Sequence, residues 1–221
     1  MQTFDTPAPV STVLDIPAGR IRFIATDRDD TTVEILPADP SRSRDAKAAE
    51  RTAVSLTDGV LRITVPASGS PLSGSAGSVE VTVRLPADSR IQAKAAGAEL
   101  RTAGRLGDIA FDGAYRRVEI EEAASLRLTA ADGDVEVGRL DGPAEISTER
   151  GDIRIAEAAR GTVVLSTRMG DITVAAAPGA SARLDAGTGD GRVTNTLKND
   201  GTTALDIRAT TSRGDITARS L

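Results

Sequence analysis

Cysteine and histidine are both absent from the 221 residues of this chain. Without cysteine the chain can form neither a disulfide nor a thiolate metal site, which excludes a disulfide-rich secreted scaffold. Without histidine it lacks the side chain that most often serves as a general base and as a transition-metal ligand. We therefore expect no cofactor.

Aromatic residues make up only 2% of the chain, with no Trp and one Tyr. A narrow β-solenoid filled by Ile, Val, Leu, Ala and Thr needs few large rings, so this scarcity favours that architecture. The single tyrosine, Tyr115, argues against an aromatic platform for binding sugars.

Charge of one sign is also not concentrated anywhere, although the formal net charge is −5. Because no basic block stands out, we expect no nucleic-acid partner. No apolar run is long enough to span a membrane, and residues 1–12 lack the pattern of a signal peptide. The sequence as given predicts a cytoplasmic protein, with a surface location only if a leader is missing from it.

A Gly-Asp dipeptide is present six times in the second half of the chain and punctuates it at near-regular intervals. Its central copies are spaced by 18, 19 and 19 residues. The copies are Gly107-Asp108, Gly133-Asp134, Gly151-Asp152, Gly170-Asp171, Gly189-Asp190 and Gly214-Asp215. An internal repeat of this length is the signature of a solenoid, and we interpret these dipeptides as structural repeat turns.

Apolar and polar residues alternate on both sides of the central glycines. Before Gly151 the apolar side is formed by Ala144, Ile146 and Thr148, and after it Ile153 and Ile155 continue the pattern. Period-2 alternation places one face of a strand in a core and the other in water. The fold class predicted is all-β, a single-stranded β-helix or solenoid with rungs of about 19 residues.

The copy at Gly189 is degenerate, because Gly191 stands where an Ile or Val is expected and leaves Val193 alone on that face. A glycine within a strand indicates a bulge or a weak rung. The copy at Gly107 is irregular before the turn but keeps Ile109 and Phe111 after it.

The first part of the chain is β-rich without the regular repeat, so we place a boundary near residue 90. Residues 1–90 are predicted to form an N-terminal β-rich cap lobe, and residues 91–221 the Gly-Asp repeat solenoid. Asp58-Gly59 predicts a hairpin with a type I′ turn, residues 40–51 a short helix, and the Ser/Gly-rich residues 68–78 a loop.

No cap is recognisable at the other end, since the chain stops at Leu221, just after the last repeat. An open β edge attracts further strands. We therefore hypothesise that the C-terminal rung pairs with another copy, which makes a homo-oligomer possible beside an unknown protein partner.

The segments STERGDIRI, LSTRMGDITV and TTSRGDITARS, with VEVTVRLPADSRI earlier, resemble a bacterial family of putative adhesins with β-strand repeats, a domain of unknown function. The resemblance covers nearly the whole chain and implies a β-helix. It implies no catalytic residues, because fold alone does not fix function.

In-register rungs would stack the repeat aspartates about 4.8 Å apart. We favour a reading in which each carboxylate binds backbone N–H groups of its own turn and shares the column with Arg105, Arg150, Arg168 and Arg213. A calcium ladder is the alternative, although calcium needs six to eight oxygens. The triplets Arg150–Asp152 and Arg213–Asp215 match a cell-attachment motif, but we interpret them as repeat turns.

The densest acidic cluster is Glu119, Glu121 and Glu122 beside Arg116 and Arg117. Paired carboxylates could cleave a polysaccharide, but Glu119 and Glu121 alternate with Val118 and Ile120 and thus predict an ordinary solvated strand face. We therefore predict no enzyme and no metal site. The function expected is a non-catalytic scaffold or interaction module, with a carbohydrate-binding or carbohydrate-cleaving β-helix, or a calcium-stabilised adhesin, as alternatives.

Overall fold

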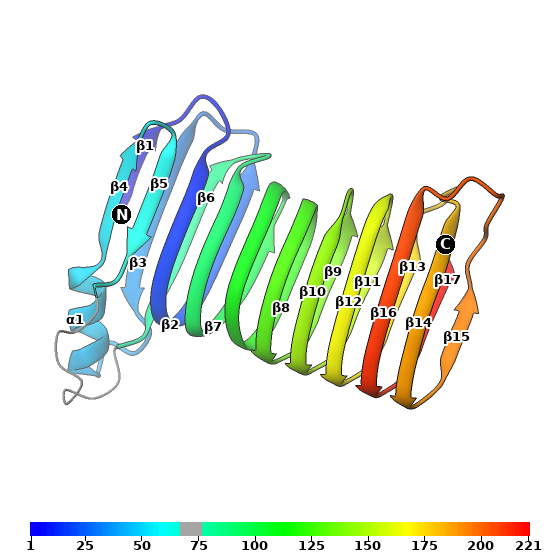
Figure 1. Cartoon of the computed structure of the whole chain (residues 1–221). Coiled ribbons are helices and arrows are strands. Elements are labelled where there is room, and N and C mark those ends of the chain that lie inside the picture. The colour runs from blue at the N-terminus through cyan, green and yellow to red at the C-terminus, as the bar shows by residue number, and fades with distance from the viewer. Residues whose placement is uncertain (67–76) are drawn as a thin grey trace.

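The computed structural model describes residues 1–66 and 77–221, without the side chains of residues 114–116, and it is nearly all β. Two layers of strands run side by side along one long axis, from helix α1 at one end to β15 at the other (Figure 1). The predicted loop at 68–78 lies outside the described residues except for Gly77 and Ser78.

Most strands contribute to one layer only, whereas β2, β7 and β8 turn a corner and serve both. The first layer contains, in spatial order, β4 (Ala53–Thr57), β5 (Val60–Thr64), β2 (Ser11–Thr26), β7 (Arg90–Ala103), β8 (Arg105–Asp132), β10 (Ala144–Arg150), β12 (Gly161–Met169), β16 (Leu205–Arg213) and β14 (Ala182–Asp190). The second contains β1 (Gln2–Asp5), β3 (Asp30–Pro37), β6 (Val79–Pro86), the later parts of β2 and β7, the middle of β8, then β9 (Val135–Leu140), β11 (Ile153–Ala158), β13 (Ile172–Ala176), β17 (Ile216–Ser220) and β15 (Val193–Thr196).

Parallel pairing between successive repeats keeps like residues opposite each other. Ile146 of β10 pairs with Leu165 of β12, and Ile153 of β11 pairs with Ile172 of β13. All four are buried, whereas the intervening Ser147 is exposed. The predicted alternation is therefore confirmed, and it gives one continuous core between the two layers.

The spatial order of the last strands departs from their order in the chain. β16 pairs in parallel with both β12 and β14, and β17 with both β13 and β15. In Figure 1 the red arrow of β16 accordingly lies between the yellow β12 and the orange β14. The expectation of an open C-terminal rung is wrong, because the C-terminal strands are paired on both sides and β14–β15 is outermost.

Side-chain composition accounts for this arrangement. The C-terminal strands place a complete set of apolar residues in the core, and Ile207, Ala209 and Ile216 are at most 1% exposed. β14–β15 instead carries several glycines and charged residues, and Val193 is 42% exposed. The coil with the poorer apolar pattern loses less by standing at the end.

The other end of the molecule changes to antiparallel pairing. β4 pairs antiparallel with β5, β3 with β6, and β1 with β3. Asp58 and Gly59 both have positive φ, 51° and 73°, which confirms the predicted hairpin turn. The predicted helix is α1 (Ser43–Arg51), next to β3 and β6. β2 and β7 pair directly, so the sheets run without interruption past residue 90.

Candidate functional surface

Four of the predicted repeat glycines stack at one corner between the layers: Gly133, Gly151, Gly170 and Gly214, with φ from 125° to 153°. A Cβ placed on Gly170 would lie 2.1 Å from the carbonyl oxygen of Gly151. The corner thus combines a backbone conformation open to glycine with a close approach of the neighbouring backbone.

The remaining two repeat glycines are not at equivalent places. In the end coil the corner glycine is Gly191, with φ 153°, which packs on Gly214. Gly189 lies two residues earlier, and Val193 after the turn is in register with the buried Ile216 but is itself 42% exposed. Gly107 lies in the first layer, where Asp108 accepts a hydrogen bond from Ser125 Oγ at 2.7 Å.

The repeat aspartates at this corner form a ladder of hydrogen bonds between neighbouring coils. Oδ1 of Asp134 accepts the N–H of Asp152 at 3.0 Å, and Oδ1 of Asp152 accepts the N–H of Asp171 at 2.8 Å. The ladder continues through Asp215 and ends at the N–H of Arg192 in the end coil. Each carboxylate therefore binds the next coil and not, as expected, its own turn.

The arginines expected to share this column pair with carboxylates outside the ladder, although Asp190, the partner of Arg213, is itself a repeat aspartate. Arg150 pairs with Asp132 at 2.7 Å, Arg168 with Glu149, Arg213 with Asp190, and Arg105 with Asp88. Both Arg-Gly-Asp triplets lie at this corner, with their aspartates in the ladder. No group of three or more acidic side chains in the described part of the chain is placed to hold a metal ion.

A second ladder, of threonine hydroxyls, was not predicted. Oγ1 of Thr167 donates to the carbonyl oxygen of Gly151, Thr211 to that of Gly170, and Thr188 to that of Gly214. These threonines lie three residues before their own corner glycine. A polar residue recurring at a core position of a repeat was the signal that could have revealed the ladder.

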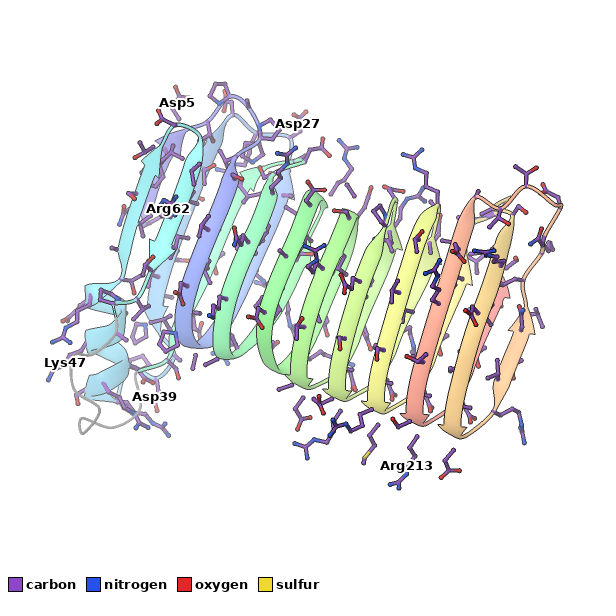
Figure 2. All side chains as sticks on the ribbon, viewed as in Figure 1. Asp5, Asp27, Asp39, Lys47, Arg62 and Arg213 are labelled. Atoms are coloured by element: carbon purple, nitrogen blue, oxygen red, sulfur yellow. The ribbon has the colours of Figure 1, made fainter. Side chains whose placement is uncertain are left out.

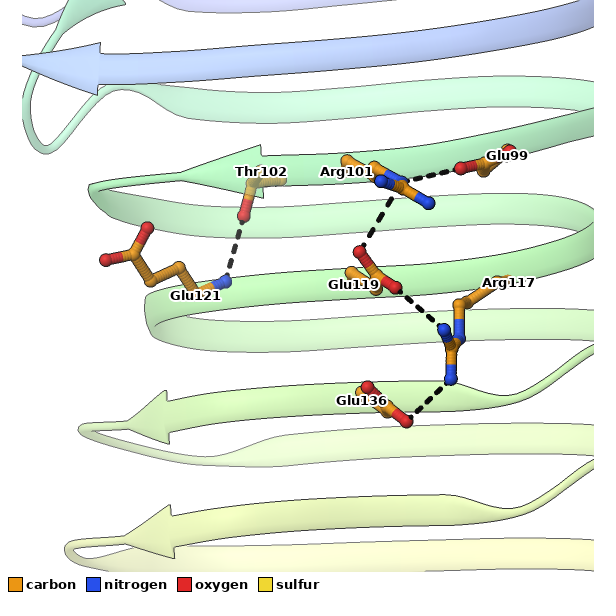
Figure 3. Close-up of polar contacts among 7 residues, drawn as sticks. All are labelled: Glu99, Arg101, Thr102, Arg117, Glu119, Glu121 and Glu136. Carbon is orange, nitrogen blue, oxygen red and sulfur yellow. Dashed lines mark hydrogen bonds and ion pairs between the residues drawn. The ribbon is translucent and has the colours of Figure 1, made fainter.

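The acidic cluster on the second layer forms a chain of ion pairs instead of a catalytic pair (Figure 3). Arg117 bridges two glutamates, Glu119 at 3.2 Å and Glu136 at 3.0 Å. Arg101 in turn contacts Glu119 at 3.4 Å and Glu99 at 2.6 Å. All these side chains project outward from the strands while Val118 and Ile120 are buried, as the alternation predicted.

The other members of the cluster are turned to structural contacts. Oε2 of Glu121 accepts the N–H of Gly104 at 2.9 Å, and the N–H of Glu121 donates to Oγ1 of Thr102. Glu122 is half-buried, and the side chains of Tyr115 and Arg116 lie outside the described set. The hollow lined by Glu119, Glu121 and Glu136 has a volume of about 270 Å³ and contains no nucleophile paired with a base.

The first layer has a larger, shallow hollow of about 540 Å³ that extends over six neighbouring strand segments. Two ion pairs stand in it, Arg90–Asp108 and Arg127–Glu145, each at 3.4 Å. Small side chains such as Ala110 and Ser125 lie between them. Side chains project from this face along the whole length of the molecule (Figure 2). The charged side chains in the lining of the hollow are thus two basic and two acidic ones.

A bidentate ion pair ties the end coil to its neighbour. Arg183 of β14 donates to both carboxylate oxygens of Asp206 in β16, at 2.8 and 2.9 Å. These bonds, with a further one from Arg208, lower the pKa of Asp206 to about 2.

Among the described residues, the structure contains no helix with the length and apolar character that a membrane span requires.

The family model described as Toastrack DUF4097 matches residues 13–220 of the chain. No curated protein matches the chain. Among solved structures, a putative cell adhesion protein from Clostridium sporogenes is similar, at 9% identity and a TM-score of 0.39, with 100% of this chain and 98% of that one covered. A putative adhesin from Bacteroides fragilis has 13% identity and a TM-score of 0.40, covering 100% and 95%. A protein from Parabacteroides distasonis described as a putative lipid binding protein has 10% identity and a TM-score of 0.39, covering 98% and 95%.

Proposed function

Since the chain belongs to the Toastrack DUF4097 family, a family of unknown function, we propose that it is a non-catalytic β-solenoid that serves as a scaffold or interaction module for a protein partner. One observation carries this proposal: the recurring Gly, Asp and Thr residues bind neighbouring coils, which leaves the variable outward side chains free to differ from coil to coil. Flat, charged strand faces suit recognition of another protein better than enclosure of a substrate.

The charged faces also support a non-enzymatic role. Glu119 and Glu136 are held by Arg117 on an open strand face, where water is not excluded. A catalytic carboxylate needs a pocket in which a reacting atom can be placed beside it. Activity on a panel of polysaccharides that disappears in Glu119→Gln would contradict the proposal.

The finer architecture belongs to the same proposal. We propose rungs of about 19 residues in residues 91–221, and a cap formed by residues 1–90, supported by the antiparallel strands β1, β3 and β4 at that end. The Gly-Asp residues of the four copies at the corner act as turns that hold these rungs together. A homo-oligomer would need a contact other than β16 and β17, and a cytoplasmic location stays a prediction.

The partner can be tested with charge-reversal variants on opposite layers. We expect the wild-type chain to capture a partner protein from native cells. Only one of two single variants should lose this partner, either Glu136→Lys on the second layer or Glu145→Lys on the first, and that variant identifies the binding layer. Both side chains project outward, and circular dichroism checks that each variant stays folded. A capture profile that neither variant changes would contradict binding through these faces.

Carbohydrate binding is the second candidate, and the hollow at Ala110 favours it. Paired charges offer hydroxyl groups both donors and acceptors without attracting ions. Binding of a linear neutral oligosaccharide, followed by NMR, should disappear in Ala110→Arg, which would fill the hollow. Shifts that survive this substitution would contradict a site here.

A further inference from the structure

One column of outward side chains on the second layer contains two like-charged pairs in succession, a basic one and an acidic one. Register places Thr82 of β6, Arg22 of β2, Arg101 of β7, Glu119 of β8 and Glu136 of β9 opposite one another in that order. Like charges directly opposite each other destabilise a sheet unless another group bridges them. We call this row the charge column.

The acidic neighbours of the charge column are bridged, and the basic neighbours are not. Arg117 contacts both Glu119 and Glu136, as Figure 3 shows. Arg101 is occupied by Glu99 and Glu119. Arg22 is exposed, and no carboxylate in the described residues pairs with it.

Arg22 and Arg101 line a hollow of about 390 Å³ together with Arg20, which pairs with Glu80. Arg20, Arg22 and Arg101 contribute three positive charges, while Glu80 and Glu99 contribute two negative ones. The hydroxyl of Thr82 lies in the same hollow and adds a hydrogen-bond donor. Arginine is well suited to bidentate recognition of planar or tetrahedral oxyanions.

We propose that this hollow binds a phosphate or sulfate group, which bridges Arg22 and Arg101 as Arg117 bridges Glu119 and Glu136. The site takes a discrete oxyanion, free or as an ester on a small molecule or glycan, and not an anionic membrane surface. Glu80 and Glu99 flank Arg20 in the neighbouring row, and their carboxylates oppose an extended negative surface.

The test uses inorganic phosphate, titrated into the full chain at constant ionic strength and followed by NMR. We expect shifts confined to the amides of residues 20–22, 80–82 and 99–101, and binding weakened about tenfold or more in Arg22→Gln. The matched control is Arg154→Gln, an exposed arginine on β11 in the same layer that lacks a like-charged neighbour; it should bind as the wild type does. Equal binding by Arg22→Gln and wild type would overturn the proposal.

A second variant keeps the test independent of stability. Arg22→Glu places a carboxylate opposite Arg101, so we expect a higher thermal midpoint together with no response to phosphate.

Vesicles of phosphatidylglycerol and phosphatidylcholine distinguish a soluble phosphate from the phosphate of a lipid headgroup. Binding to these vesicles without any response to soluble phosphate would overturn the proposal in favour of a membrane surface.

Discussion

A side chain at one of the corner glycines should destabilise the fold. Gly170 is the best position for this test because its coil lies between two other coils. Its φ of 153° falls where side chains are rarely tolerated, and a Cβ would lie 2.1 Å from the carbonyl oxygen of Gly151. Backbone strain of this kind costs about 1–3 kcal/mol. Relieving the clash also requires the two coils to separate locally.

Separation would weaken the hydrogen bonds on either side of the corner. The N–H of Gly151 donates to the carbonyl oxygen of Met169 at 2.9 Å, and the N–H of Ile153 donates to the carbonyl oxygen of Asp171 at 2.9 Å. At about 1 kcal/mol each, their loss brings the expected destabilisation of Gly170→Ala to roughly 3–5 kcal/mol. That is a large share of the 5–15 kcal/mol, roughly, by which a domain is stable.

Gly179→Ala is the matched control. Gly179 also has a positive φ, 78°, but a Cβ added there would meet nothing within 4 Å, so only about 1–2 kcal/mol of strain is expected. Urea unfolding followed by far-ultraviolet circular dichroism measures both variants, since the chain has no Trp for fluorescence. Equal midpoints for the two variants would refute the close approach of neighbouring coils.

Three further predictions concern the ladder, the strand order and pH. Thr167→Val should lower the free energy of unfolding by about 1–3 kcal/mol, because the carbonyl oxygen of Gly151 loses the hydroxyl donor. Thr167→Ser keeps the hydroxyl and should retain most of this stability. Equal urea midpoints for the two variants would contradict the hydrogen bond. Ile207→Ala should lower the free energy of unfolding by about 2–5 kcal/mol, and Leu184→Ala should lower it clearly less. The reason is that Ile207 is fully buried and its register partner Leu184 is only half-buried. The reverse ranking of the two urea midpoints would contradict the strand order. Because the folded-state pKa of Asp206 is lowered to about 2, its pairing stabilises the fold above about pH 4 and this contribution is lost as pH falls toward 2. NMR titration should show the midpoint of Asp206 rising toward its ordinary value in Arg183→Ala, and an unchanged midpoint would contradict the pairing.

Local alternation was enough to predict which residues are buried. Ile146 and Ile153 could be assigned to the core because side chains on a strand alternate with a period of two. The same periodicity explains what could not be predicted at the end coil. Counting back from Gly191 gives Leu184, Ala186 and Thr188, and counting from Gly189 gives an equally alternating set, so a shift of two residues leaves the pattern unchanged.

The partners of the polar groups depended on tertiary structure. The sequence shows Asp152 as a recurring carboxylate, but nothing in a single repeat distinguishes an N–H of its own turn from the N–H of Asp171 in the next coil. Arg22 and Arg101 are 79 positions apart in the chain, and only the pairing of β2 with β7 makes them neighbours. The proposed oxyanion site therefore could not be inferred from the sequence.

The degenerate repeat lies at the end of the solenoid because an end coil has an exposed strand edge and a less buried core. An outermost strand presents unpaired backbone groups, and proteins protect such edges with short strands and charged side chains, while glycines weaken a strand as a template for pairing. β15 has four residues, all exposed, and β14 carries Gly187 and Gly189 together with Arg183 and Asp185 on its outward face. The C-terminal strands have the stronger apolar pattern, and by lying inside they cover the edges of β12 and β13. The fold thus places its poorest repeat where burial is least available and further strand pairing is most hazardous.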